Sequence, residues 1–101
     1  MFENEMKTVR HLKERIRRGK RPLIVAIIEE KCEVEGTYWV VRWLPSLPIF
    51  VDGETLQEAR SEAVRKLETL FGKANICLRI KVIRSLLAPF FGYLEDDPRS
   101  N

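Results

Sequence analysis

The sequence predicts an α+β fold, with a three- to four-stranded sheet, one main helix packed on it and an extra basic helix at the N-terminus. Two runs rich in β-branched and aromatic residues, 23–28 and 37–44, flank a charged turn and predict a β-hairpin. A capped amphipathic stretch at 55–71 predicts the main helix, and alternating side chains at 76–83 predict a last strand. With 101 residues, the chain fits one domain of ordinary size.

The N-terminal helix is expected over residues 5–18. Apolar residues recur there at helical spacing from Met6 to Ile16, and Gly19 and Pro22 end the pattern. The apolar stripe is narrow, so this helix has little surface to bury and much to expose.

Residues 1–22 form a basic arm. They hold eight Lys/Arg and three Glu, a net charge of +5, so the rest of the chain carries −2 of the total of +3. This density of cations suits phosphates or an acidic protein surface, and it is also typical of a solvated terminal helix. The residues expected to contact nucleic acid in the first case are Arg10, Lys13, Arg15, Arg17, Arg18, Lys20 and Arg21.

The hairpin at 23–44 carries the candidate residues for binding a partner. We expect its first strand to end at Ile28, because the charged cluster that follows is costly to bury. In the second strand, alternation places Arg42 on one face and Trp39 and Trp43 on the other. An acidic turn is often only solubilising, and tryptophans are often core residues, so a purely structural hairpin is the alternative. The candidate contact residues are Glu29, Glu30, Glu33, Glu35, Trp39, Arg42 and Trp43.

After the hairpin, Pro45 and Pro48 interrupt the sheet, and a short strand is expected at 49–51. Thr55 as N-cap and Glu58 three residues later form a capping box, in which each side chain is expected to accept the backbone N–H of the other residue. Because the apolar stripe of this helix is one-sided, the helix should cover one face of the sheet and leave the other free.

The chain divides into the arm at 1–22, an α+β body at 23–85 and a tail at 86–101. The tail is apolar and then acidic. We expect its apolar part either to pack on the body or to join an oligomer interface across a two-fold axis. The candidate interface residues are Phe90, Phe91 and Tyr93.

The sequence gives no reason to expect catalysis, a cofactor or a metal. His11 is the only histidine and lies among cations, so a nucleophile has no base beside it. Cys32 and Cys77 show no metal-ligand spacing, and no Gly-rich phosphate loop is present. No apolar run approaches the length of a membrane helix and no secretory signal is recognisable, so we expect a cytoplasmic protein.

The stretch from Tyr38 to Leu70 resembles the HicB-type antitoxin family. The family pattern is an aromatic-rich strand, a Pro-x-Leu-Pro segment, a short strand, a Gly-x-Thr turn and a helix that opens Thr-x-x-Glu-Ala. The matching residues are Tyr38, Val40, Pro45, Leu47, Pro48, Val51, Gly53, Thr55, Glu58, Ala59 and Ala63.

The resemblance implies a β-β-β-α-β domain, described as a partial ribonuclease H-like fold. It also implies a role, which is to bind and mask a small basic HicA-type toxin that cuts messenger RNA. Fold similarity to a nuclease does not imply nuclease chemistry. Many relatives add a DNA-binding segment for self-repression. This chain departs from that pattern, because the residues after the last strand are too few for a helix-turn-helix or ribbon-helix-helix and the extension is instead the basic arm. Three hypotheses follow: a toxin-masking protein, a nucleic-acid-binding protein that uses the arm, and a stand-alone homo-oligomer such as a homodimer.

Overall fold

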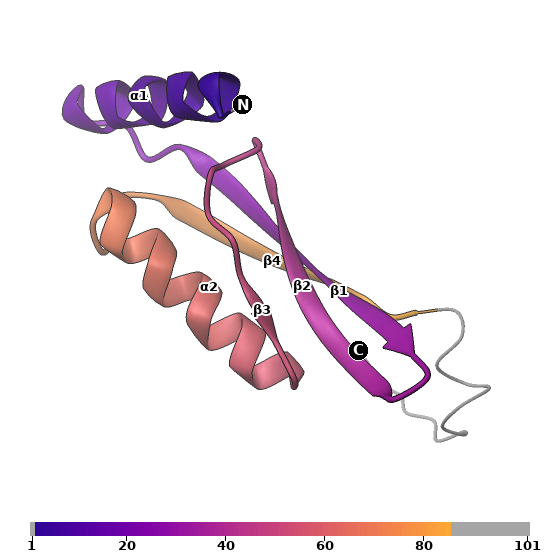
Figure 1. Cartoon of the computed structure of the whole chain (residues 1–101). Helices are drawn as coiled ribbons and strands as arrows, with labels where there is room; N and C mark the ends of the chain where they lie inside the picture. Colours follow the sequence, from indigo (N-terminus) through magenta and orange to yellow (C-terminus); the bar gives the residue numbers. More distant parts are fainter. Residues whose placement is uncertain (1, 86–101) are drawn as a thin grey trace.

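Residues 2–85 are described by a computed structural model, and their four strands form one mixed sheet in the order β3-β2-β1-β4 (Figure 1). The central strand β1 runs antiparallel to β2 and parallel to β4, and β3 pairs antiparallel with β2. The predicted α+β class is confirmed. The elements in chain order are α1 (Glu3–Arg17), β1 (Leu23–Glu33), β2 (Gly36–Leu44), β3 (Asp52–Gly53), α2 (Leu56–Phe71) and β4 (Cys77–Ile83).

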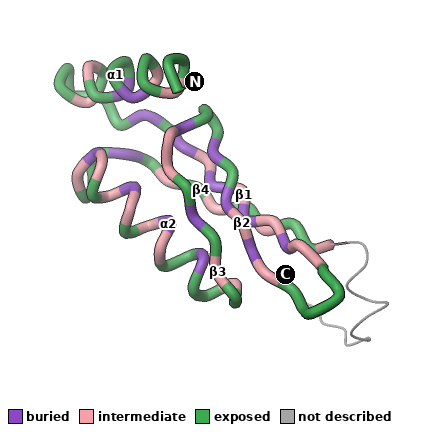
Figure 2. The backbone as a smooth tube through the Cα atoms, viewed as in Figure 1, coloured by how far each residue is buried: buried purple, intermediate pink, exposed green. Residues whose placement is uncertain are grey.

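Alternation along the strands gives the sheet one buried face. Every second residue of β1 from Ile24 to Glu30 is buried, and Trp39 and Trp43 of β2 lie on the same side. Figure 2 shows these buried positions alternating with less buried ones along the two strands. The split of β2 into a Trp39–Trp43 face and an Arg42 face agrees with the prediction.

Helix α2 covers the buried face because small and apolar residues recur at helical spacing along it. Ala59, Ala63 and Leu67 are completely buried, and the two alanines let the helix approach the sheet closely. The approach is close at Gly53, where an added Cβ would lie 2.8 Å from the backbone nitrogen of Ala59. Thr55 caps the helix by accepting a hydrogen bond from the backbone N–H of Glu58 at 3.0 Å.

The opposite face of the sheet is left open. On the central strand, Val25 and Ile27 are only half-buried. Leu23 and Leu44, on neighbouring strands of the same face, are 50% and 56% exposed. We call this surface the open face.

Strand β1 is longer than predicted. It continues through the charged cluster to Glu33, where the sequence predicted a turn after Ile28. Most of the charged cluster is not buried in this strand, because side chains alternate between the two faces. Glu29 and Lys31 point to the open face, and only Glu30 points inward. The turn proper consists of Val34 and Glu35, and Gly36 adopts a positive φ of 139° there.

The short strand also begins later than predicted. It comprises Asp52–Gly53, where the sequence predicted 49–51. The preceding Val51 still contributes, since its carbonyl accepts a hydrogen bond from the N–H of Val41 at 3.1 Å. Sequence periodicity does not reveal this register, which is set by pairing with β2.

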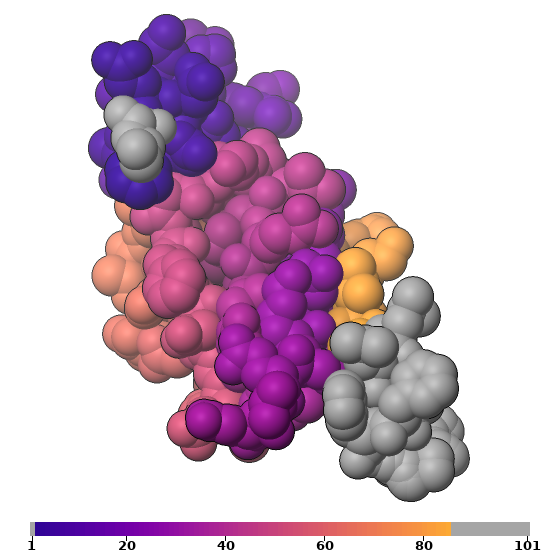
Figure 3. Space-filling model, turned by 45° about the vertical axis from the view of Figure 1, so that its right-hand side comes forward, coloured from indigo at the N-terminus to yellow at the C-terminus, as the bar shows by residue number. Residues whose placement is uncertain are grey.

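Helix α1 lies across one end of the sheet, and the β1–β2 turn lies at the other end (Figures 1 and 3). Val9 and Leu12 of α1 are 5% and 6% exposed and belong to the same core cluster as the sheet residues. Glu5 adds a polar contact by accepting a hydrogen bond from the Ser46 hydroxyl at 3.4 Å. The basic helix is therefore part of the folded body.

Candidate interaction surfaces

The two tryptophans predicted as contact residues lie in the core. Trp39 and Trp43 are 5% and 6% exposed on the face covered by α2. The indole N–H of Trp43 donates to the carbonyl of Ile49 at 3.0 Å, which fixes the proline-containing segment against the sheet. The Arg84 guanidinium stacks over Trp39 at 5.3 Å from the ring centroid. These side chains hold the fold together and are not part of a binding surface.

Arg42 and Glu29 lie on the open face and contact each other. The Arg42 Nε lies 3.4 Å from a Glu29 carboxylate oxygen, and the Lys31 ammonium lies 3.5 Å from the other oxygen. The charge of Glu29 is therefore shared between two cations. Exposed ion pairs of this kind contribute little to stability, so the partners remain available for exchange with other charged groups.

Glu30 is buried and holds the end of β4. Its side chain is on the inner face, and the residue is 8% exposed. One carboxylate oxygen accepts a hydrogen bond from the backbone N–H of Ser85 at 3.0 Å. A hydrogen bond to a charged acceptor at a buried position is strong, so Glu30 has a structural role and is not a surface contact residue.

Acidic residues from two separate segments meet near Tyr38, at the end of the sheet remote from α1. Glu33 ends β1, and Asp52 of β3 pairs with the residue two positions beyond Tyr38 on β2. The negative charge of Glu33 is the main reason why the pKa of Tyr38 is raised above its ordinary value of 10.0, and Asp52 raises it further. Glu35 in the turn is exposed at the same end. We call Glu33, Glu35, Asp52 and Glu54 the acidic end.

Sequence reasoning found half of the acidic end. Glu33 and Glu35 stand out as a charged turn, whereas Asp52 and Glu54 look like ordinary residues around a glycine. Only the pairing of β3 with β2 brings them to the hairpin, as the register of Val40 with Asp52 shows. The sequence predicted the third strand at 49–51, three residues too early, and only its true position at Asp52–Gly53 would have placed these carboxylates beside the hairpin.

The predicted nucleic-acid-binding cations lie on or just after α1 and are exposed. Three of them have structural partners. Arg17 and Arg18 form ion pairs with Glu14, one turn before them on the same helix. Arg21 donates to the carbonyl of Ile76 at 3.3 Å and so fixes the arm to the start of β4. Within residues 2–85 no ion pair involves the remaining four, Arg10, Lys13, Arg15 and Lys20.

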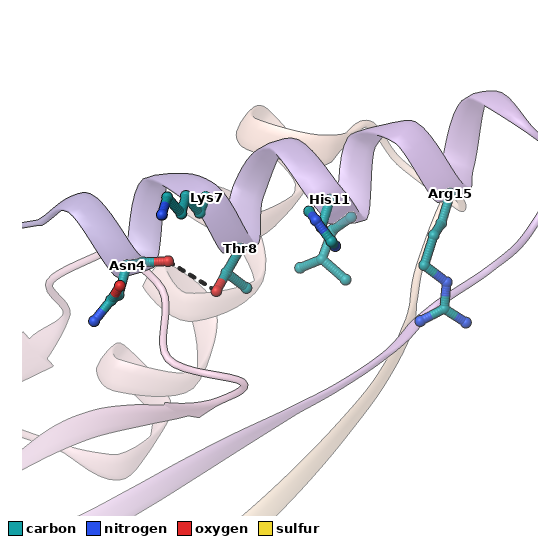
Figure 4. Close-up of a pocket in the computed structure, with 6 residues that line it drawn as sticks. Asn4, Lys7, Thr8, His11 and Arg15 are labelled. Carbon is teal, nitrogen blue, oxygen red and sulfur yellow. Dashed lines mark hydrogen bonds between the residues drawn. The ribbon is translucent and has the colours of Figure 1, made fainter.

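A shallow depression of ≈ 470 Å³ runs along one side of α1 (Figure 4). Its polar wall repeats at helical spacing, because the side chains one turn apart share that side of the helix. The Thr8 hydroxyl donates to the carbonyl of Asn4 at 3.0 Å. Lys7 and Arg15 also line the depression and give it a positive charge. The lining residues are Asn4, Lys7, Thr8, His11, Leu12 and Arg15, of which the sequence predicted only Arg15 as a contact residue.

The remaining predictions concern thiols, metals and the tail. Cys32 is half-buried, Cys77 is exposed, and both are free thiols. Across residues 2–85, no three His, Cys, Asp or Glu side chains lie together in a way that could hold a metal ion. Phe90, Phe91 and Tyr93, the predicted oligomer-interface residues, lie outside the described residues.

The comparisons add no relative. No protein-family model matches the chain, and searches of curated proteins and of solved structures found no match. Neither of the helices described in residues 2–85, α1 and α2, is long and apolar enough to cross a membrane.

Proposed function

We propose that this chain is a binding protein of the HicB antitoxin type, which masks a small basic RNA-cleaving partner and does not turn over a substrate. The observation that carries the proposal is the acidic end. Its four carboxylates come from the β1–β2 turn and from the β3–α2 junction, and both segments lie at the end of the molecule remote from α1 (Figure 1).

Charge complementarity supports a basic partner at this end. A protein that grips RNA carries cations where the phosphates bind, and an acidic surface can occupy that region in place of RNA. The β3–α2 junction is held firmly, since Thr55 and Glu58 cap α2 immediately beside Glu54. A rigid surface loses little conformational entropy on binding.

The proposal predicts that a small basic protein is encoded beside this chain, and it is tested by expressing that neighbour alone and together with the chain. We expect the neighbour alone to stop growth, and co-expression to restore growth and to yield a complex that co-purifies. The variant Glu33→Lys/Glu35→Lys should fail to restore growth. The matched variant Glu3→Lys/Glu68→Lys changes the charge equally away from the acidic end and should still restore it. A neighbour without toxicity, or equal rescue by both variants, would contradict the proposal.

A second candidate function is nucleic-acid binding through α1. The observation in its favour is that α1 is anchored by Val9 and Leu12 while its cations and the depression of Figure 4 face outward. Phosphate contacts of this type give binding that weakens steeply with salt and depends little on sequence. A titration of labelled DNA and RNA at two salt concentrations tests it. Arg10→Glu/Arg15→Glu should weaken binding by about tenfold or more, and unchanged affinity would argue against α1 as the element responsible.

A further inference from the structure

Strand β4 forms a free edge of the sheet. It pairs in parallel with β1 on one side, and none of the strands described in residues 2–85 lies on its other side. It is 7 residues long, close to the common length of a strand in a sheet. An edge of this length offers a row of backbone donors and acceptors to another chain.

The backbone groups directed outward can be assigned. The N–H of Cys77 donates to the carbonyl of Pro22 at 2.9 Å, so the backbone groups of Cys77 point toward β1. Successive residues of a strand direct their N–H and C=O groups to opposite edges. The groups on the free edge are therefore those of Leu78, Ile80 and Val82.

The side chains of β4 alternate in character as well as in direction. Leu78, Ile80 and Val82 are half-buried against the core on the side of α2. Arg79 and Lys81 are exposed on the open face, and no ion pair within residues 2–85 involves either of them. Across the sheet, Lys81 lies beside Ile27, and Arg42 flanks Ile27 on its other side.

This pattern disfavours pairing between two copies of β4. When identical strands pair antiparallel about a two-fold axis, residues directly opposite each other point to the same face. Registers centred on Arg79, Ile80 or Lys81 use most of the strand. They place Arg79 against Arg79, Arg79 against Lys81, or Lys81 against Lys81 of the second copy. Like charges directly opposite each other destabilise a strand pair, so the edge does not suit a copy of itself.

We propose that β4 accepts an extended segment of another protein by strand addition, and that this segment alternates acidic and apolar residues. Its backbone would pair with Leu78, Ile80 and Val82. Its carboxylates would lie opposite Arg79 and Lys81 on the open face, and its apolar side chains would extend the inner face beside α2. This surface is distinct from the acidic end, so the inference goes beyond the proposed function and fails or succeeds independently of it.

The test uses the full chain and labelled peptides of 7 residues, the length of β4, followed by fluorescence anisotropy at low salt. One peptide alternates Val and Glu, and a second alternates Val and Lys. We expect the Glu peptide to bind at least about tenfold more tightly than the Lys peptide. The side chains opposite Arg79 and Lys81 attract these cations in the Glu peptide and repel them in the Lys peptide. A Glu peptide N-methylated at alternate residues, which lacks the donors for strand pairing, should lose binding.

Two protein variants complete the test. Arg79→Glu/Lys81→Glu should reverse the preference, so that this variant binds the Lys peptide more tightly than the Glu peptide. Arg60→Glu/Arg65→Glu changes the net charge equally at exposed positions of α2 and should keep the preference for the Glu peptide. The inference is overturned if the Glu peptide does not bind, if the Glu and Lys peptides bind equally, or if the N-methylated peptide binds as well as its parent.

Discussion

At the scale of single residues, Tyr38 reports on the acidic end. The phenol lies near two carboxylates, and the charge of Glu33 opposes formation of tyrosinate and raises the pKa of Tyr38 above 10.0. Glu33→Gln should lower this pKa toward its ordinary value, and Asp52→Asn should lower it by less. The chain has two tyrosines, and the substitution Tyr93→Phe leaves Tyr38 as the only one. Ultraviolet titration of proteins that carry this substitution measures the change in the pKa of Tyr38.

Glu35 supplies the control for this titration. The carboxylates that raise the pKa of Tyr38 are those of Glu33 and Asp52, whereas Glu35 is exposed in the turn that follows Glu33. Glu35→Gln should therefore leave the titration unchanged. An equal shift with Glu33→Gln and Glu35→Gln would mean that only the total charge of this end matters, and that the two carboxylates near Tyr38 are not placed as described.

At Gly53 the backbone of β3 lies close to the backbone of α2. A Cβ at this position would lie 2.8 Å from the Ala59 nitrogen, and backbone cannot move away as a flexible side chain can. We expect Gly53→Ala to lower the free energy of unfolding by about 1–3 kcal/mol, the usual cost of overpacking. Urea denaturation measures this, with exposed Gln57→Ala as the control. An unchanged midpoint for Gly53→Ala would contradict the close contact.

At the scale of elements, the start of α2 is the clearest case of local control. Thr55 accepts the N–H of Glu58 as predicted, but the Glu58 carboxylate accepts the N–H of Glu54, one residue before the cap, at 2.8 Å. Thr55→Ala should lower the free energy of unfolding by about 1 kcal/mol, because one helix N–H loses its acceptor. Thermal and urea melts compare it with Gln57→Ala. Equal stability of these two variants would argue against the cap.

The helices were predictable from sequence because their determinants are local. The cap at Thr55, the stop at Gly72 and the apolar stripe of α2 all lie within the helix or next to it. The end of β1 was not predictable, because the partner of the buried Glu30 is the backbone of Ser85, which is far away in sequence. The tryptophans of β2 were correctly assigned to one face, but alternation alone does not say which face α2 covers.

At the scale of the whole molecule, charge is divided between two ends. The arm carries a net charge of +5 within residues 1–22. The acidic end lies at the opposite end of the sheet, where the β1–β2 turn is (Figures 1 and 3). The sequence predicted the arm because its cations are contiguous. It predicted the acidic end only in part, since Asp52 and Glu54 join Glu33 and Glu35 through the pairing of β3 with β2. Association through either end should be faster at low salt, as expected for charged surfaces.

The most direct test of the proposed function is a calorimetric titration of the purified chain with the small basic protein that the proposal predicts to be encoded beside it. We predict binding that Glu33→Lys/Glu35→Lys weakens by about tenfold or more, since these changes oppose charge complementarity at the acidic end. The matched Glu3→Lys/Glu68→Lys variant should bind like the original chain. Absence of binding, or the same affinity for both variants, would contradict the assignment of the acidic end as the surface that masks a basic partner.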